Sequence, residues 1–217
     1  ERLCLLCQEA QIPSGVTKQG RFYCNTCEKE WILEKRKIPR LGKTVLTSEE
    51  KTEFLLDCLS LFNSSISLED LLSRFSELIQ ERLKREKIAI FIANLELGDI
   101  KLAYYSAKQK SLQRAIKRIN LDYDLSFGAL IETMAKRESR FYSLNEQNHP
   151  FYQFYANLTG TKSQLVIPIL YANTAVGMLA VDYEEEDYSD YIEDQEVLQL
   201  VTGQFAVALR NSLLYSK

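Results

Sequence analysis

Four of the five cysteines in this 217-residue chain lie within its first thirty residues, as two Cys-x-x-Cys pairs. Cys4 and Cys7 form the first pair, and Cys24 and Cys27 form the second. A two-residue gap lets a tight turn direct both thiolates at one point, so two such turns complete a tetrahedral shell around Zn²⁺. We therefore predict one zinc ion bound by these four cysteines. Two disulfides are the alternative, which a reducing compartment disfavours.

The predicted zinc is structural rather than catalytic. A catalytic zinc keeps an open position, usually beside His or carboxylate ligands, whereas four cysteines close the shell. The only histidine, His149, lies far along the chain before Pro150 and is expected to be a loop or turn residue. A segment of about forty residues cannot be stabilised by its core alone. The metal is therefore expected to hold residues 1–40 together, in an arrangement that resembles zinc-ribbon and treble-clef modules.

The residues around the second cysteine pair predict a short strand at 22–23 and a helix over 28–37. Residues 41–65 are expected to be a linker and a connecting helix, because Pro39 and Gly42 interrupt a basic stretch. This stretch is either a solvated linker or a basic face of the zinc module for nucleic acid or an acidic protein. We favour the solvated linker, because few aromatic side chains are interleaved with the basic ones.

Composition limits the partners of the chain as a whole. The formal net charge is −3, so no overall positive field attracts nucleic acid or anionic lipid. No apolar run approaches the roughly 18 residues that a membrane helix requires, and no signal-peptide pattern opens the sequence. We expect a cytoplasmic protein without membrane contact.

Two amphipathic helices are expected before any strong strand. Thr47 and Glu50 form a capping-box pattern at the start of a helix over 48–62, and Ser67 is expected to cap a second helix over 67–85. Cys58 lies on the apolar stripe of the first helix, which predicts an inert core thiol.

The rest of the chain is rich in strands. Residues 87–94 and 100–107 are expected to be strands, and residues 163–183 a hairpin that turns at Ala172 and Asn173. A long helix is expected over 193–217. This order predicts an α+β fold, with one antiparallel sheet and helices packed on one face.

The C-terminal half resembles a GAF domain. Such domains show a Ser before an apolar strand, a Pro near its end, a Gly in the next strand, an acidic residue at a helix start, and an Ala-rich helix ending in Asn. The matching positions are Ser163, Pro168, Gly177, Asp194, Ala206, Ala208 and Asn211, with Gly128 at the start of an upstream short helix. The resemblance covers residues 66–217. It implies an antiparallel sheet with a ligand-sized pocket under the crossover helices, and a homodimer formed through the N- and C-terminal helices of the domain.

Several family functions do not carry over. The residues that mark cyclic-nucleotide-binding GAF domains are absent in recognisable order. No cysteine follows Cys58, so the family's bilin attachment and the thiol chemistry of free-methionine-sulfoxide reductases have no matching residue. His149 alone is weak support for a haem.

Two further clusters have alternative interpretations. The aromatic crossover offers candidate ligand-binding residues at Phe127, Tyr142, Phe151 and Tyr155. They are either the wall of a pocket for a planar small molecule or simple core, and core is favoured. Nine acids occur between Asp182 and Glu196. They are either a solvated loop with helix N-terminal charge or a docking surface for a basic partner.

These observations predict a non-enzymatic regulatory protein. A GAF-like domain senses a small molecule or mediates homodimerisation, and the structural zinc module contacts an unidentified protein partner. A nucleic-acid-binding regulator that reads through its zinc module is one alternative, and a pocketless GAF scaffold that joins proteins is the other. No Ser/His/Asp set and no phosphate-binding Gly loop is recognisable in the sequence.

Overall fold

The computed structural model divides the chain into two units, Glu1–Thr44 and Val45–Lys217. It describes residues 46–64, 67–94, 98–106, 120–122, 128–184 and 190–215, together with two short strands at 22–23 and 30–31. Cys4, Cys7, Cys24, Cys27 and Phe127 lie outside the described residues, and with them the predicted zinc shell.

The described part of the smaller unit is one antiparallel pair. Strand β1 (Phe22–Tyr23) pairs with β2 (Glu30–Trp31), with Phe22 opposite Trp31. The strand expected at 22–23 is confirmed. The helix expected over 28–37 is wrong at Glu30 and Trp31, because pairing with β1 satisfies backbone groups that local helix propensity alone would have used within a helix.

The larger unit is built on one six-stranded sheet in the order β5-β4-β3-β8-β7-β6, with every neighbouring pair antiparallel. Its strands are β3 (Lys87–Asn94), β4 (Asp99–Tyr105), β5 (Asn120–Asp122), β6 (Arg140–Ser143), β7 (Ser163–Tyr171) and β8 (Thr174–Tyr183). The predicted α+β class and antiparallel sheet are confirmed.

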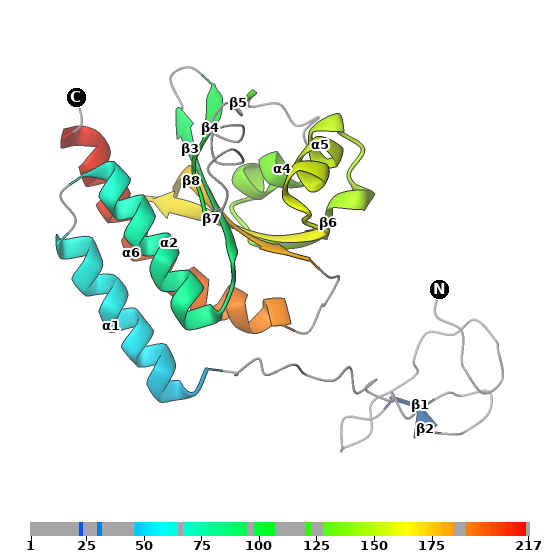
Figure 1. Cartoon of the computed structure of the whole chain (residues 1–217), viewed down its shortest axis with the longest axis horizontal. Coiled ribbons are helices and arrows are strands. Elements are labelled where there is room, and N and C mark those ends of the chain that lie inside the picture. Colours follow the sequence, from blue (N-terminus) through cyan, green and yellow to red (C-terminus); the bar gives the residue numbers. More distant parts are fainter. Residues whose placement is uncertain are drawn as a thin grey trace. The chain divides into compact units, whose positions relative to one another are not determined.

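Helices cover both faces of this sheet (Figure 1). One face packs against α1 (Ser48–Ser64), α2 (Leu68–Leu83) and α6 (Asp190–Tyr215). The other packs against α4 (Ala129–Lys136) and α5 (Pro150–Thr159), with the short 3₁₀ helix η2 (Leu144–Glu146) between β6 and α5. The expectation of helices on one face only is therefore wrong.

The central strands explain why both faces are covered. In β3, Ile88 and Ile90 point into the core under α1, α2 and α6, whereas Ala89 and Phe91 point into the core under α4 and α5. All four side chains are fully buried. A strand that is apolar at consecutive positions has to be covered on both sides, since successive side chains alternate between the faces.

Local sequence signals set the ends of several elements. Thr47 N donates to Glu50 Oε2 at 2.7 Å, and Glu50 N donates to Thr47 Oγ1 at 3.2 Å, which confirms the capping box before α1. Ser67 Oγ likewise accepts from Asp70 N and caps α2. Ala172 and Asn173 have φ of 46° and 64°, the left-handed conformation of a tight hairpin turn, so the predicted β7–β8 hairpin is confirmed.

Gly177 is required for the pairing of β8 with β3. A Cβ atom at this position would lie 2.3 Å from the backbone oxygen of Phe91, which is far inside van der Waals contact. The bare glycine thus permits a close approach between the two central strands, and these strands carry the polar residues described next.

Candidate functional site

The structure brings together the predicted ligand-binding aromatics that it describes. Tyr142 lies on β6, and Phe151 and Tyr155 lie on α5. The ring of Phe151 is 5.6 Å from that of Tyr155, and Tyr152 joins the group at 5.3 Å from Phe151 and 5.8 Å from Tyr142. Tyr142 is 8 % exposed and Tyr155 is 1 % exposed. These rings pack on one another between α5 and the sheet, as core residues do, and their role in ligand binding stays a prediction.

A row of polar residues crosses the same face of the sheet. Tyr142 is opposite Gln164, Gln164 is opposite Asp182, and Asp182 is opposite Lys87, on the adjacent strands β6, β7, β8 and β3. We call these four residues the polar row. Neighbouring positions on this face are apolar, such as Val166 and Ala180. A polar row within an apolar face costs free energy unless its groups are hydrogen-bonded.

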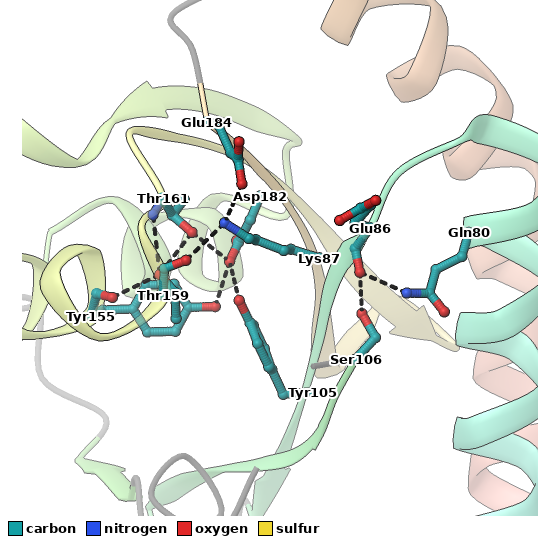
Figure 2. A network of polar contacts seen from close by, with 10 residues as sticks. All are labelled: Gln80, Glu86, Lys87, Tyr105, Ser106, Tyr155, Thr159, Thr161, Asp182 and Glu184. Carbon is teal, nitrogen blue, oxygen red and sulfur yellow. Dashed lines mark hydrogen bonds and ion pairs between the residues drawn. The ribbon is translucent and has the colours of Figure 1, made fainter. Parts of the chain in front are cut away.

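Asp182 is the centre of this row and accepts four hydrogen bonds. Its Oδ2 accepts from the hydroxyls of Tyr155 at 2.8 Å, Thr161 at 3.0 Å and Tyr105 at 3.3 Å. Its Oδ1 accepts from Gln164 Nε2 at 2.6 Å. Figure 2 shows the two tyrosines and Thr161 converging on the carboxylate from β4, from α5 and from the segment between α5 and β7. This single side chain therefore ties three separate parts of the fold to β8.

The row continues at both ends. Tyr142 donates through its hydroxyl to Gln164 Oε1 at 2.5 Å. Lys87 Nζ donates to the backbone oxygen of Thr159 and to Glu184 Oε1, each at 2.8 Å (Figure 2). The chain of polar contacts thus runs from β6, at the edge of the sheet, to the end of α5 and the segment after β8.

Burial dominates the protonation of this cluster. Desolvation raises the pKa of the Asp182 carboxyl, although the bonds from Gln164 and the hydroxyls act in the opposite direction. Burial also raises the pKa of Tyr142 and of Tyr155, and it raises the pKa of Tyr152 to about 12. The tyrosines therefore remain protonated hydrogen-bond donors near neutral pH, which favours a positioning role over proton transfer.

A surface cavity of about 400 Å³ borders one end of the polar row. It lies between α4 and the edge strand β6, and its lining residues are Ala129, Glu132, Arg140, Phe141, Tyr142 and Gln147. Arg140 Nη1 donates to Glu132 Oε2 at 2.7 Å across it, and Gln147 Oε1 accepts from the backbone N–H of Ala129. Cavities of this size accommodate small organic ligands.

On the opposite face, a buried ion pair joins α6 to the start of β3. Arg85 Nε lies 2.6 Å from Asp194 Oδ2, and both side chains are 8 % exposed. Tyr183 donates its hydroxyl to the same carboxylate oxygen at 2.7 Å, and the Arg85 guanidinium lies over the Tyr183 ring. Phe141 packs near Tyr183 and stacks on Tyr191 of α6, with ring centroids 4.3 Å apart.

These contacts correct the interpretation of the acidic run. Asp182 and Asp194 are both buried and hydrogen-bonded in the interior, so neither belongs to a solvated loop or to a docking surface. Glu184, by contrast, is largely exposed. Within the sequence, the signal for Asp182 is its position at the end of an apolar strand, directly before Tyr183.

His149 and Cys58 occupy structural positions, as expected. His149 precedes α5, and its Nδ1 accepts from the backbone N–H of Phe151. Cys58 is 1 % exposed in the core, and burial raises the pKa of its thiol to about 12. Among the residues that the structure describes, no group of three or more His, Cys, Asp or Glu side chains is arranged to hold a metal ion.

Comparison with known proteins identifies the fold. The family model described as GAF domain matches residues 65–210, which is more than half of the chain. The chain belongs to the GAF domain family.

Several solved structures share this architecture at low sequence identity. The GAF domain of a two-component sensor histidine kinase from Bacillus halodurans has a TM-score of 0.58 and 25% identity, covering 70% of this chain and 100% of that one. The GAF domain of an Acinetobacter phosphoenolpyruvate-protein phosphotransferase has a TM-score of 0.61 and 17% identity, covering 78% and 99%. Free methionine-R-sulfoxide reductase from Neisseria meningitidis, in complex with its substrate, has a TM-score of 0.61 and 14% identity, covering 78% and 95%. No curated protein matches the chain.

The positions from which the GAF resemblance was inferred have structural roles. Ser163 and Pro168 lie on β7, Gly177 allows β8 to approach β3, and Asp194 receives the buried Arg85. Gly177 and Asp194 therefore contribute to the packing of the GAF fold. The described helices of this GAF domain include none that is both long enough and apolar enough to cross a membrane.

Proposed function

We propose that this protein is a non-enzymatic regulatory protein whose GAF domain forms a homodimer through α1 and α6. The observation that carries the proposal is a set of exposed apolar side chains on these two helices. Leu200, Val207 and Leu214 of α6 are 61 %, 46 % and 54 % exposed. Leu56 and Leu59 of α1 are 60 % and 41 % exposed. We call these five residues the helix face.

The spacing on α6 supports a helical partner. Leu200, Val207 and Leu214 recur every seven residues, which places them along one line of a helix and is the repeat of helix–helix seams. The helix has 26 residues and packs beside α1 and α2 (Figure 1). Fully burying an exposed Leu or Val side chain contributes about 1.5–3 kcal/mol, and these side chains, already about half buried, would contribute roughly half as much. A second copy presents the same face, so a two-fold symmetric dimer would cover both.

A regulatory rather than catalytic role rests on the chemistry of the described residues. In residues 45–217 the sole cysteine is Cys58, which is buried and has a raised pKa, so it is a poor nucleophile. The Bacillus halodurans relative is the GAF domain of a two-component sensor histidine kinase, and this supports a role in signalling. Small-molecule sensing is the second candidate, favoured by the cavity beside Tyr142.

The mass of the full chain in solution tests the homodimer. Size-exclusion chromatography with light scattering at micromolar concentration should give twice the 25.1 kDa mass of one chain. A mass of one chain at these concentrations would contradict the proposal.

The N-terminal unit is proposed to be a structural zinc module that contacts an unidentified protein partner. The four cysteines provide a complete sulfur shell, and the pairing of β1 with β2 brings together the residues that flank Cys24 and Cys27. Metal analysis of the reduced full chain should find about one zinc per chain. The Cys24→Ser variant should lose the metal while the GAF domain keeps its melting temperature. Reduced wild-type protein without zinc would contradict this part of the proposal.

A further inference from the structure

The groove between α4 and β6 is open to solvent, and residues of both elements line it. On α4, Ala129 and Glu132 are three residues apart and face the strand, and on β6, Arg140 and Tyr142 are two residues apart and face the helix. Gln147 also lines the groove, and its Oε1 accepts from the N–H of Ala129 at 3.2 Å. The groove is therefore bounded by two regular elements and one side-chain bridge.

Opposite charges lie next to each other in this groove. Arg140 and Glu132 are about one-third exposed, at 34 % and 38 %, and their side chains meet at 2.7 Å. Glu132 Oε2 accepts from Arg140 Nη1 and, at 3.3 Å, from Lys136 Nζ, so among the described contacts the Glu132 Oε1 atom and the remaining guanidinium nitrogens of Arg140 are not used. A guanidinium can hold a carboxylate through two parallel bonds, and a carboxylate can hold an ammonium group. The pair thus offers both halves of a site for a small zwitterion.

The residues that line the groove are connected to the interior on both faces of the sheet. Tyr142 begins the polar row, which continues through Gln164 to Asp182. Its neighbour Phe141 stacks on Tyr191 of α6. A molecule in the groove would contact Phe141 and Tyr142, two successive residues of β6. Tyr142 is hydrogen-bonded to the Asp182 network, and Phe141 stacks on α6, the helix that carries part of the helix face.

We propose that this groove binds a free α-amino acid, with Arg140 holding its carboxylate and Glu132 its ammonium group. The cavity of about 400 Å³ is large enough for an amino acid with its side chain lying along Tyr142. The proposal names the ligand class of the sensing role above and rests on that proposed function. It assigns binding to the groove between α4 and β6, which Phe151 and Tyr155 do not line.

Thermal unfolding of the full chain with each of the common free amino acids tests the assignment. At least one should raise the melting temperature in a concentration-dependent manner, because a ligand of the folded state stabilises it by mass action. The N-acetyl and the amide derivatives of that amino acid should give little or no shift, since each removes one of the two charges. No shift with any free amino acid, or equal shifts with both derivatives, would overturn the proposal.

Titration calorimetry with the amino acid that gives the largest shift locates the site. Arg140→Gln and Glu132→Gln should each weaken binding about tenfold or more, the usual effect of losing a charge-assisted hydrogen bond. Arg140→Lys keeps the charge but loses the two-bond geometry, so it should bind with intermediate affinity. Arg74→Gln, which removes an exposed ion pair on α2, is the matched control and should bind like the wild type. Unchanged affinity in a folded Arg140→Gln variant would overturn the assignment.

Light scattering on the same samples separates this inference from the proposed dimer. A dimer that binds no amino acid would contradict the ligand assignment and support the homodimer. A monomer that binds an amino acid through Arg140 and Glu132 would contradict the homodimer and support the ligand assignment.

Discussion

At the scale of single residues, the buried Asp182 carboxylate has the largest consequence for pH dependence. The pKa of this carboxyl is raised in the folded protein, so the folded state binds the proton more tightly than the unfolded state does. The stabilisation linked to that proton is fully present below the ordinary value of 3.8 and is lost as the pH rises through the folded pKa.

The direction of this pKa shift predicts how the stabilities of the wild type and of Asp182→Asn differ with pH. We expect the free energy of unfolding of the wild type, minus that of Asp182→Asn, to increase as the pH is lowered from about 7 toward about 4. Urea unfolding across this range measures it, and the subtraction removes most contributions from other carboxylates. A difference that decreases toward low pH would mean that hydrogen bonds to the carboxylate outweigh its burial.

Ser76 of α2 gives a second residue-scale prediction. Its side chain is fully buried, and its hydroxyl has no hydrogen-bond partner. Removing a buried unpartnered hydroxyl relieves its desolvation, so Ser76→Ala should stabilise the protein by about 0.5–1 kcal/mol in urea unfolding. Ser73→Ala removes a hydroxyl that donates to Glu77 on the same helix and should be neutral or slightly destabilising. Destabilisation by Ser76→Ala would indicate that this hydroxyl does have a partner in solution.

At the scale of elements, the Arg85–Asp194 pair fixes α6 against the sheet. Both charges are buried, so removing one partner leaves the other uncompensated. Asp194→Asn should therefore destabilise the protein by about 3 kcal/mol or more. The double variant Arg85→Met with Asp194→Leu should recover a large part of this loss, because no unpaired charge remains.

A double-mutant cycle in urea provides the measurement. The exposed pair of Lys51 and Glu196 is a suitable control, since exposed ion pairs contribute about 0–1 kcal/mol. Equal losses at the two pairs would contradict the assignment of Arg85 and Asp194 as the buried link to α6.

Some of these elements were predictable from the sequence and others were not. Helix caps and hairpin turns depend on a few neighbouring residues, so Thr47, Glu50 and the Ala172–Asn173 turn were predictable. Coverage of both sheet faces was missed, although the unbroken apolar run of β3 is typical of a strand buried on both sides. Strand β2 was missed because it depends on pairing with β1 rather than on local propensity.

The candidate site was less predictable than the fold. The polar row depends on which strands are neighbours and on their register, since Tyr142, Gln164 and Asp182 are far apart in sequence. Likewise, Arg140 and Glu132 are eight residues apart, and only the turn between α4 and β6 brings them together. Sequence reasoning found Tyr142 as an aromatic residue but not its place at the start of the row.

At the scale of the whole molecule, one chain carries a GAF domain, with the proposed helix face, and a predicted zinc module. The Phe141–Tyr191 stack connects the edge strand β6, which lines the groove, with α6. If two copies associate through α6, a ligand that alters the packing of α6 would alter dimer formation.

The most direct test places a charge on the helix face and measures the mass of the full chain by light scattering. Val207→Glu on α6 should convert the dimer to a monomer at the same micromolar concentration, since two glutamates would be buried close together at the symmetric seam. Phe154→Glu introduces the same charge at an exposed apolar position on α5, where the native side chain is 53 % exposed, and should remain a dimer. Circular dichroism confirms that both variants are folded. A folded Val207→Glu variant that stays dimeric would contradict a homodimer formed through the helix face.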